Sequence, residues 1–236
     1  MKKHKYYGLG ARSEKYNFIS LDEYIHLNFI KKPFENGSFL ELGAIDGVKL
    51  SNTKFFEDNM GFNQGVLIEA VPELFKELQK NRPNCECYNF AIHSKLQSVE
   101  FWVSGKHNWG GCINQSSCKT HIDQFHNSGK FAGHSEVRLL PAEKLGTIIQ
   151  KSSLNYIDFW SLDVEGSELE CLNSMDWSIP IGLVCIENAS NRDPIHSIMI
   201  KQGFTLIHQH VGDGFYFNFE YFRKNLFSIN HDQSST

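Results

Sequence analysis

The sequence lacks several features that would place it in a familiar class of protein. None of its apolar runs approaches the roughly 20 residues that a membrane-spanning helix needs. No apolar stretch follows the lysines of residues 1–5, so the start does not resemble a signal peptide. Acidic and basic residues are interspersed and give a formal net charge of −4, whereas a nucleic-acid-binding protein usually carries a basic face. We therefore expect neither a membrane nor nucleic acid as a partner.

The six cysteines include no Cys-x-x-Cys pair, which argues against a zinc site. Cys85, Cys87 and Cys185 lie in strand-like runs, where cysteine packs as a small apolar side chain. With 236 residues, the chain is also large for a fold that depends on disulfides. We therefore expect reduced cysteines and a cytoplasmic location.

Apolar strand-like runs alternate with helical patterns along most of the chain. The strands that this pattern predicts are residues 39–44, 65–70, 85–92, 98–104, 136–140, 156–163, 182–187 and one on each side of 212–214. The predicted helices are residues 20–30, which begin with a Ser-Leu-Asp-Glu capping box, and residues 51–60, 72–81, 141–151, 167–175 and 194–202. Such alternation predicts an α/β fold with a mostly parallel sheet, an antiparallel end and helices on both faces.

Residues 39–47 read as a buried strand that ends in a glycine turn at Gly43 and Gly47. A helix start follows at residues 51–53, and the next strand ends on Glu69. This order is typical of a nucleoside site, because glycines let the backbone approach the ligand and the acid accepts hydrogen bonds from ribose hydroxyls. The missing third glycine of Gly-x-Gly-x-x-Gly and the missing Walker lysine argue against NAD and ATP.

Further acids lie within or directly after predicted strands, namely Glu41, Glu69, Asp163, Glu165 and Glu187. The carboxyl ends of parallel strands meet at one edge of a sheet, where open α/β folds bind their ligands. The acids therefore predict a ligand site at this edge.

Five motifs resemble the FkbM family of S-adenosylmethionine-dependent methyltransferases, in order along residues 39–217. They are ELGAIDG at 41–47, LSNT at 50–53, VLIEA at 66–70, NFAI at 89–92 and SLDVEGSE at 161–168. The most specific element is Asp-Val-Glu-Gly-x-Glu, which ordinary methyltransferases lack. The resemblance implies a Rossmann-like class I methyltransferase fold, with a seven-stranded sheet and S-adenosyl-L-methionine as cofactor.

By position, the resemblance also implies which residues contact the cofactor. The methionine portion of the cofactor would be surrounded by Glu41, Gly43, Ala44 and Gly47. Glu69 would bind the ribose hydroxyls, with Ala70 beneath the sugar, and Asn89 and Ala91 would lie near the adenine. Asn52 and Asp163 are also predicted to contact the cofactor. Two alternatives stay open: Glu69 as a strand-end acid that caps the next helix, and Asn52 as a helix cap.

Asp163 and Glu165 are the predicted catalytic residues. A hydroxyl is a poor nucleophile at neutral pH, so a carboxylate within reach could take its proton as the methyl group arrives. Glu168 is an alternative, either as a base or as an acid of the first helical turn favoured by the helix dipole. No metal is predicted, although Asp163 with Glu187 is the pair that could bind one.

We therefore expect an O-methyltransferase acting on a hydroxyl of a sugar or glycan, from a monomer or homodimer. The alternatives are a natural-product hydroxyl as acceptor and a non-catalytic module that retains the fold. Residues 1–36 are assigned to an N-terminal extension with a capping helix, and residues 37–236 to the methyltransferase domain. Within it, residues 105–135 are rich in Gly, Asn, Ser and His and predict a lid over the acceptor, where Trp109 offers a ring to a sugar.

Overall fold

The computed structural model describes residues 4–8, 19–103, 111–113, 136–187, 192–210 and 212–229. Its strands are β1 (Gly37–Leu42), β2 (Phe62–Ile68), β3 (Glu86–Tyr88), β4 (Ala91–Ile92), β5 (Ser98–Val103), β6 (Gly111–Ile113), β7 (Glu136–Glu143), β8 (Ile157–Leu162), β9 (Ile181–Glu187), β10 (Thr205–His210) and β11 (Asp213–Phe217). Its helices are α1 (Leu21–Asn28), α2 (Lys54–Asn59), α3 (Pro72–Asn81), α5 (Leu145–Lys151), α6 (Glu168–Ser174), α7 (Arg192–Lys201) and a 3₁₀ turn at Lys224–Leu226.

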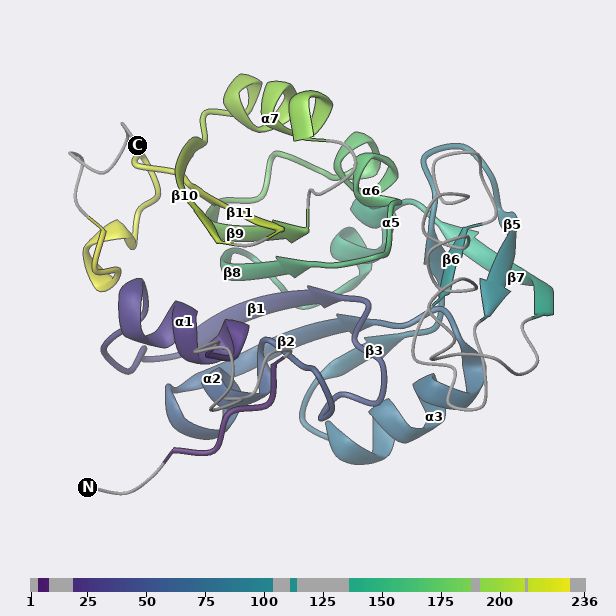
Figure 1. The fold of residues 1–236 in the computed structure, drawn as a ribbon, viewed down its shortest axis with the longest axis horizontal. Coiled ribbons are helices and arrows are strands. Elements are labelled where there is room, and N and C mark those ends of the chain that lie inside the picture. The colour runs from purple at the N-terminus through teal and green to yellow at the C-terminus, as the bar shows by residue number, and fades with distance from the viewer. Residues whose placement is uncertain are drawn as a thin grey trace.

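The central layer is a seven-stranded sheet in the order β10-β11-β9-β8-β1-β2-β3. All pairings from β9 to β3 are parallel, and β11 runs antiparallel to both of its neighbours. Strand β8 is the middle strand, and β1 lies between β8 and β2; the chain passes from β1 directly to β2 and reaches β8 only later (Figure 1). The predicted fold class, a mostly parallel sheet with an antiparallel terminal strand, is confirmed.

Each face of this sheet carries its own apolar core, because successive side chains of a strand point to opposite faces. Leu40 and Trp160 pack with α5, α6 and α7 on one face. Phe39 and Phe159 pack with α1, α2 and α3 on the other. Helix α1, which belongs to the predicted N-terminal extension of residues 1–36, thus shares an apolar core with the domain predicted at residues 37–236.

A second sheet, in the order β4-β7-β5-β6, was not predicted. It lies beyond the carboxyl ends of the central strands (Figure 1). Two sequence-based boundaries are wrong for this reason: the strand predicted at 85–92 is divided between the two sheets, and residues 141–143 extend β7 instead of starting a helix. Residues 111–113 form a strand within the segment expected to be a loop, and Trp109 lies outside the described residues.

Two smaller expectations also change. Ser20 precedes α1 as predicted, but its side chain makes no capping hydrogen bond.

Among the cysteines that the structure describes, Cys85, Cys87, Cys171 and Cys185 are free thiols. Cys112 is disulfide-bonded, so the expectation of reduced cysteines is wrong there. None of the described helices has the length and apolar character needed to cross a membrane.

Gly43 forms a close backbone contact at the carboxyl ends of the central strands. Its φ of +76° is in the left-handed region, and a Cβ built on it would lie 1.9 Å from the carbonyl oxygen of Asp163. Its N–H donates to the carbonyl of Ile68 at 3.1 Å. The turn after β1 is therefore held between the ends of β2 and β8, with no space for a side chain.

We predict that Gly43→Ala lowers the free energy of unfolding by roughly 2–5 kcal/mol, the sum of a left-handed backbone cost and a steric clash. Gly203→Ala is the matched control, because Gly203 has a φ of +82° but nothing within 4 Å of an added Cβ. It should lose only the backbone part, about 1–2 kcal/mol. Urea unfolding of both variants measures the difference, and equal losses would contradict the steric argument.

Candidate functional site

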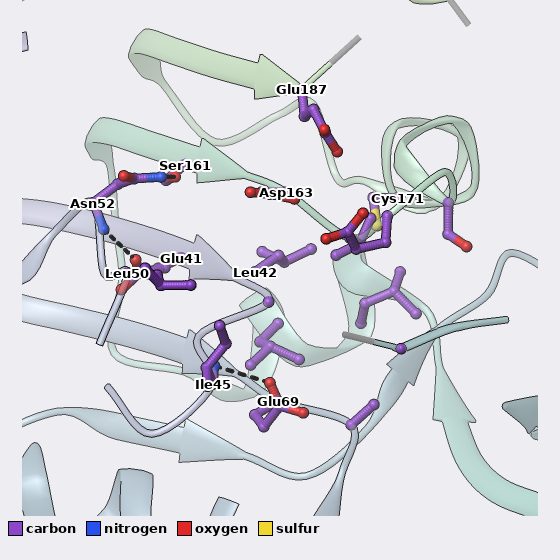
Figure 2. A pocket seen from close by; sticks show the side chains of 18 of the residues that line it. Glu41, Leu42, Ile45, Leu50, Asn52, Glu69, Ser161, Asp163, Cys171 and Glu187 are labelled. Carbon is purple, nitrogen blue, oxygen red and sulfur yellow. Dashed lines mark hydrogen bonds between the residues drawn. The ribbon is translucent and has the colours of Figure 1, made fainter. Parts of the chain in front are cut away.

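A cavity of about 720 Å³ opens at the carboxyl ends of the central strands. It is bounded by the turns after β1, β2 and β8, by the end of β9, by the β10–β11 hairpin and by the second sheet. Figure 2 shows its walls. The predicted site residues that line it are Glu41, Gly43, Asn52, Glu69, Ala70, Ala91, Asp163 and Glu165.

Three predicted cofactor residues do not line the cavity. Ala44 is buried behind the turn after β1. Gly47 has a φ of +77° and closes that turn. The side-chain amide of Asn89 donates to the carbonyl oxygens of Glu69 and Ala70 at 2.8 and 3.0 Å. In the structure these three residues stabilise the turns that carry the residues lining the cavity.

Glu69 is held from two directions by the backbone. One carboxylate oxygen accepts the N–H of Ile45 at 2.9 Å, and the other accepts the N–H of Val71, which precedes α3, at 2.7 Å (Figure 2). Burial raises the pKa of Glu69 to about 7, and the backbone hydrogen bonds oppose this shift. The sequence left open that Glu69 caps the next helix, and its hydrogen bond with the N–H of Val71 at the start of α3 is such a contact. Because each carboxylate oxygen has two lone pairs, both can still accept from a ligand.

Glu41, by contrast, is fully engaged inside the protein. Its carboxylate accepts hydrogen bonds from the hydroxyls of Ser51 and Thr53, at 2.9 and 2.6 Å, and from the N–H of Asn52 at 2.8 Å. The buried guanidinium of Arg82 lies 3.7 Å away. Glu41 thus shapes the segment between β1 and α2, and Arg82 is a functional neighbour that the sequence did not reveal, because it comes from the distant end of α3.

Asn52 is not the cap of α2, since Thr53 precedes the first helical residue. Its side-chain amide donates to the hydroxyl of Ser161 at 3.0 Å, which ties the β1–α2 segment to β8. Its side-chain oxygen is buried without a hydrogen-bond partner among the described residues. The cap alternative is therefore wrong.

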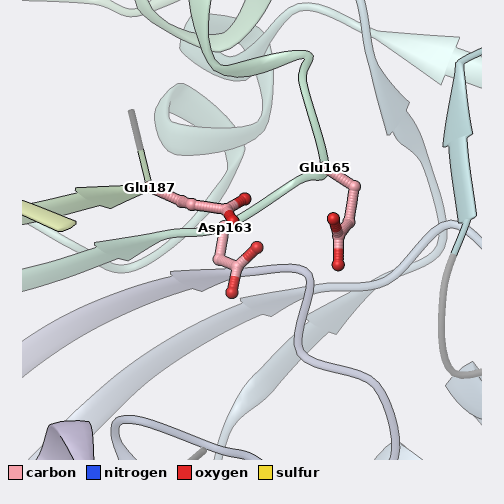
Figure 3. A group of neighbouring side chains, drawn as sticks. All are labelled: Asp163, Glu165 and Glu187. Atoms are coloured by element: carbon pink, nitrogen blue, oxygen red, sulfur yellow. The ribbon is translucent and has the colours of Figure 1, made fainter. Parts of the chain in front are cut away.

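Asp163, Glu165 and Glu187 come together at one side of the cavity. Each offers a carboxylate oxygen, and the three oxygens lie within 4.8 Å of one another (Figure 3). Burial raises the pKa of Asp163 well above its ordinary value, and the neighbouring charges of Glu187 and Glu165 add to the effect. A group of this kind can hold a proton, bind hydroxyls or gather a divalent cation.

Two further titratable residues, on β11 and β10, lie beside the group of Asp163, Glu165 and Glu187. Asp213 pairs with Glu187, and His210 pairs with Asp213, so their side chains are directed to one face. Burial raises the pKa of Asp213 to about 6. Sequence reasoning missed Asp213 and His210, although their place beside the hairpin glycines was a signal that they lie at the same edge as the other acids.

Glu168 has a different role from the one considered as a catalytic alternative. It is buried at the start of α6 and accepts the N–H groups of Val164 and Gly166 at 3.2 and 3.0 Å. It does not line the cavity. Glu168 therefore holds the loop that carries Glu165, as expected of a first-turn acid.

Backbone strain gathers at this site. Ile45, Leu50 and Glu165 have φ values of 52°, 61° and 55° and all line the cavity. A left-handed conformation costs a non-glycine residue roughly 1–3 kcal/mol, and it persists only where the surroundings enforce it. Strain concentrated at one cavity is an indicator of function that the sequence could not provide.

The end of the cavity beside Glu69 is apolar. Phe90 and Ile92 line it from the segment after β3, and Phe101 and Ile113 line it from the second sheet. The small residues Ala70 and Ala91 pack in the same apolar cluster as Phe101 and Ile113. This end suits a flat, weakly polar group, whereas the opposite end is acidic.

The Methyltransferase FkbM domain family matches the chain over residues 41–227. Among solved structures, the chain is similar to Methyltransferase FkbM from Methylobacillus flagellatus KT, with 14% identity and a TM-score of 0.47, over 83% of this chain and 50% of that one. It is also similar to M. capricolum TrmK in complex with S-adenosyl-homocysteine, with 10% identity and a TM-score of 0.44, over 85% and 68%. This chain therefore spans half the length of the M. flagellatus protein. No curated protein matches it.

The raised pKa of Glu69 predicts a loss of stability as the pH rises. Between about 4.5 and 7 the unfolded chain releases this proton while the folded protein keeps it, so the free energy of unfolding falls by about 3 kcal/mol on account of Glu69. Below this window the contribution is fully present. Urea unfolding at a series of pH values should show the decline, and Glu69→Gln should lack this part of it. Parallel profiles for the two proteins would contradict the prediction.

Proposed function

The chain belongs to the FkbM family of S-adenosylmethionine-dependent methyltransferases, and on that premise we propose that it transfers the methyl group to a hydroxyl of a sugar or glycan. The observation that carries the proposal is the arrangement of the cavity: Glu69 beside an apolar end, and Asp163 within an acidic end. One end suits the nucleoside of the donor, and the other suits a polar acceptor with several hydroxyls.

The residues of the cavity fit S-adenosylmethionine. Glu69 is oriented by two backbone N–H groups and keeps lone pairs for the ribose hydroxyls. Gly43 leaves the turn after β1 without a side chain, while Ala70 and Ala91 leave room for the sugar and base. When bound, the cofactor supplies a methyl group on a sulfonium, which an aligned nucleophile can displace.

Asp163 is the residue that we propose as the proton acceptor for the attacking hydroxyl. Burial and the neighbouring Glu187 and Glu165 raise its pKa, and a base is most effective when its pKa approaches the working pH. Glu165 is the alternative base, because its carboxylate belongs to the same group. Both residues would also orient the acceptor, which itself lowers the barrier.

The charges of the cavity support a neutral acceptor. Among the described residues that line it there are acids at both ends and no lysine or arginine. A phosphate or carboxylate 4 Å from one such acid would be repelled by about 4 kcal/mol at an effective dielectric constant of 20. Sugar hydroxyls, in contrast, donate hydrogen bonds to carboxylates. This favours an uncharged glycoside over a phosphorylated one.

A metal-assisted reaction is the second candidate mechanism. It is favoured by the three carboxylate oxygens of Asp163, Glu165 and Glu187, which converge within 4.8 Å. A divalent cation there would orient the acceptor hydroxyl and lower its pKa. A cytoplasmic location and a monomeric or homodimeric state remain predictions of the sequence alone.

Donor binding is tested by calorimetry with S-adenosylhomocysteine. At about pH 8, above the pKa of about 7 that burial gives Glu69, we predict affinity in the micromolar range for the wild-type protein and a loss of at least about 100-fold in Glu69→Ala, since two hydrogen bonds to a charged acceptor disappear. Glu86→Ala is the matched control, because Glu86 binds Ser153 and Tyr88 and does not line the cavity. Well-folded wild-type protein that releases no heat would exclude a methyltransferase role.

Methyl transfer is tested against a panel of glycosides and natural-product alcohols, with the product mass measured. We predict that Asp163→Asn binds S-adenosylhomocysteine normally but loses at least about 100-fold in turnover, and that a phosphorylated glycoside is a poorer acceptor than its neutral parent. Addition of a chelator separates the two mechanisms. Full activity of Asp163→Asn would place the base elsewhere, and abolition by the chelator would favour the metal.

A further inference from the structure

The N-terminal residues 4–8, called the arm from here on, dock on two helices of the domain. The ring of Tyr6 lies on that of Phe55 in α2, with centroids 4.5 Å apart. Its hydroxyl is 2.8 Å from Nδ1 of His26 in α1. The hydroxyl of Tyr7 donates to Asp58 at 2.9 Å. Side chains therefore fix the arm to both α1 and α2.

Asp22, in the first turn of α1, receives the backbone of the arm. Its carboxylate is fully buried and accepts the N–H of Tyr7 at 2.6 Å. Burial raises the pKa of Asp22, and the hydrogen bonds from Tyr7 and Gly8 oppose this shift. A buried carboxylate that loses its donors is strongly destabilised. Release of the arm would thus remove the donors Tyr7 and Gly8 and leave Asp22 with the N–H of its neighbour Glu23.

The end of the arm touches the wall of the cavity. Gly8 forms an isolated parallel bridge with Leu50. A Cβ built on Gly8 would lie 2.9 Å from side-chain oxygens of both Asn52 and Asp22. Leu50 and Asn52 line the cavity, and so do Ile19 and Leu21 beside Asp22. The arm is therefore wedged between the start of α1 and the cofactor side of the cavity.

Leu50 is the point at which the arm can affect the ligand. Its left-handed φ of 61° is unfavourable for a leucine and needs support from its surroundings. On one side, Glu41 clamps the following residues 51–53. On the other side, the backbone of Gly8 pairs with Leu50 itself. The arm thus supplies one of the constraints on this wall, beside Glu41 and the hydrogen bond from Asn52 to Ser161.

We propose that the arm is a positioning strap for the cofactor: its docking holds Leu50 and Asn52 in the ligand-binding conformation, and a bound cofactor in turn stabilises the docked arm. This inference rests on the proposed function for the identity of the ligand. Linkage requires the two effects to be equal in size, because a coupling free energy between two sites is reciprocal. Gly8 and Asp22 are then positioning residues, which act through Leu50 and Asn52.

The test uses the full-length chain with Gly8→Val, whose side chain has no space in the docked arm. We expect its affinity for S-adenosylhomocysteine to fall by roughly 5–150-fold, the usual range of such coupling. Reciprocally, S-adenosylhomocysteine should slow hydrogen exchange of the amides of residues 6–8 in the wild-type protein by a comparable factor. Gly203→Val is the control, because an added Cβ there meets nothing within 4 Å; its left-handed φ of +82° adds a backbone cost, so the control also covers a general loss of stability.

A second variant covers the case in which Gly8→Val fails to fold. Asp22→Asn keeps the shape of the side chain and one acceptor, and it should show a smaller loss of affinity with slower exchange still induced by the ligand. Ligand-independent exchange at residues 6–8, or an unchanged affinity in folded Gly8→Val, would overturn the strap. Absence of binding by the wild-type protein would instead count against the donor, and the strap would fall with it.

Discussion

The site depends on one constraint: residue 43 must be glycine, because the backbone there touches the backbone of Asp163. Strands β1 and β8 are neighbours in the sheet, yet the chain reaches β8 only after more than a hundred residues. At their carboxyl ends the backbone of Gly43 passes so near to the carbonyl of Asp163 that a methyl group would overlap it. This close approach places the turn after β1 beside the acids after β8 and β9. The apolar end beside Glu69 and the acidic end of the cavity therefore form one continuous space.

Buried carboxylates organise the walls of this space, and they divide into two groups by their partners. Glu41 and Glu168 use their oxygens on internal N–H and hydroxyl groups, so that they hold loops in place. Glu69 and Asp163 face the cavity, and burial raises the pKa of each. Acids of the first group stabilise the strained backbone at the site, whereas those of the second group are available to a ligand. The same residue type thus holds loops in place and lines the cavity, and Glu69, which accepts two backbone N–H groups, does both.

Much of the fold was predictable because the signals were local. The alternation of buried strands and amphipathic helices indicated a parallel sheet, and the acids at the strand ends indicated a site at its carboxyl edge, where the cavity lies. The second sheet escaped prediction because β4 has only two residues and pairs with β7, about fifty residues later. Likewise, Arg82, Asp213 and His210 join the site through contacts or sheet register with distant segments. The hairpin glycines beside Asp213 and His210 were a local signal, but the strands that these residues pair with are set only by the assembled sheet.

By itself, the sequence determined the fold class, the family and the set of acids that meet at the carboxyl edge of the sheet, since apolar periodicity and strand-end motifs are short-range properties. Only the tertiary structure decided which of those acids are held by internal donors and which converge at one side of the cavity. Glu41 and Glu168 turned out to be occupied, whereas Asp163, Glu165 and Glu187 converge. The physical reason is that hydrogen-bond partners and neighbouring charges are supplied by residues far apart in the chain. They come within reach only when the sheet is assembled.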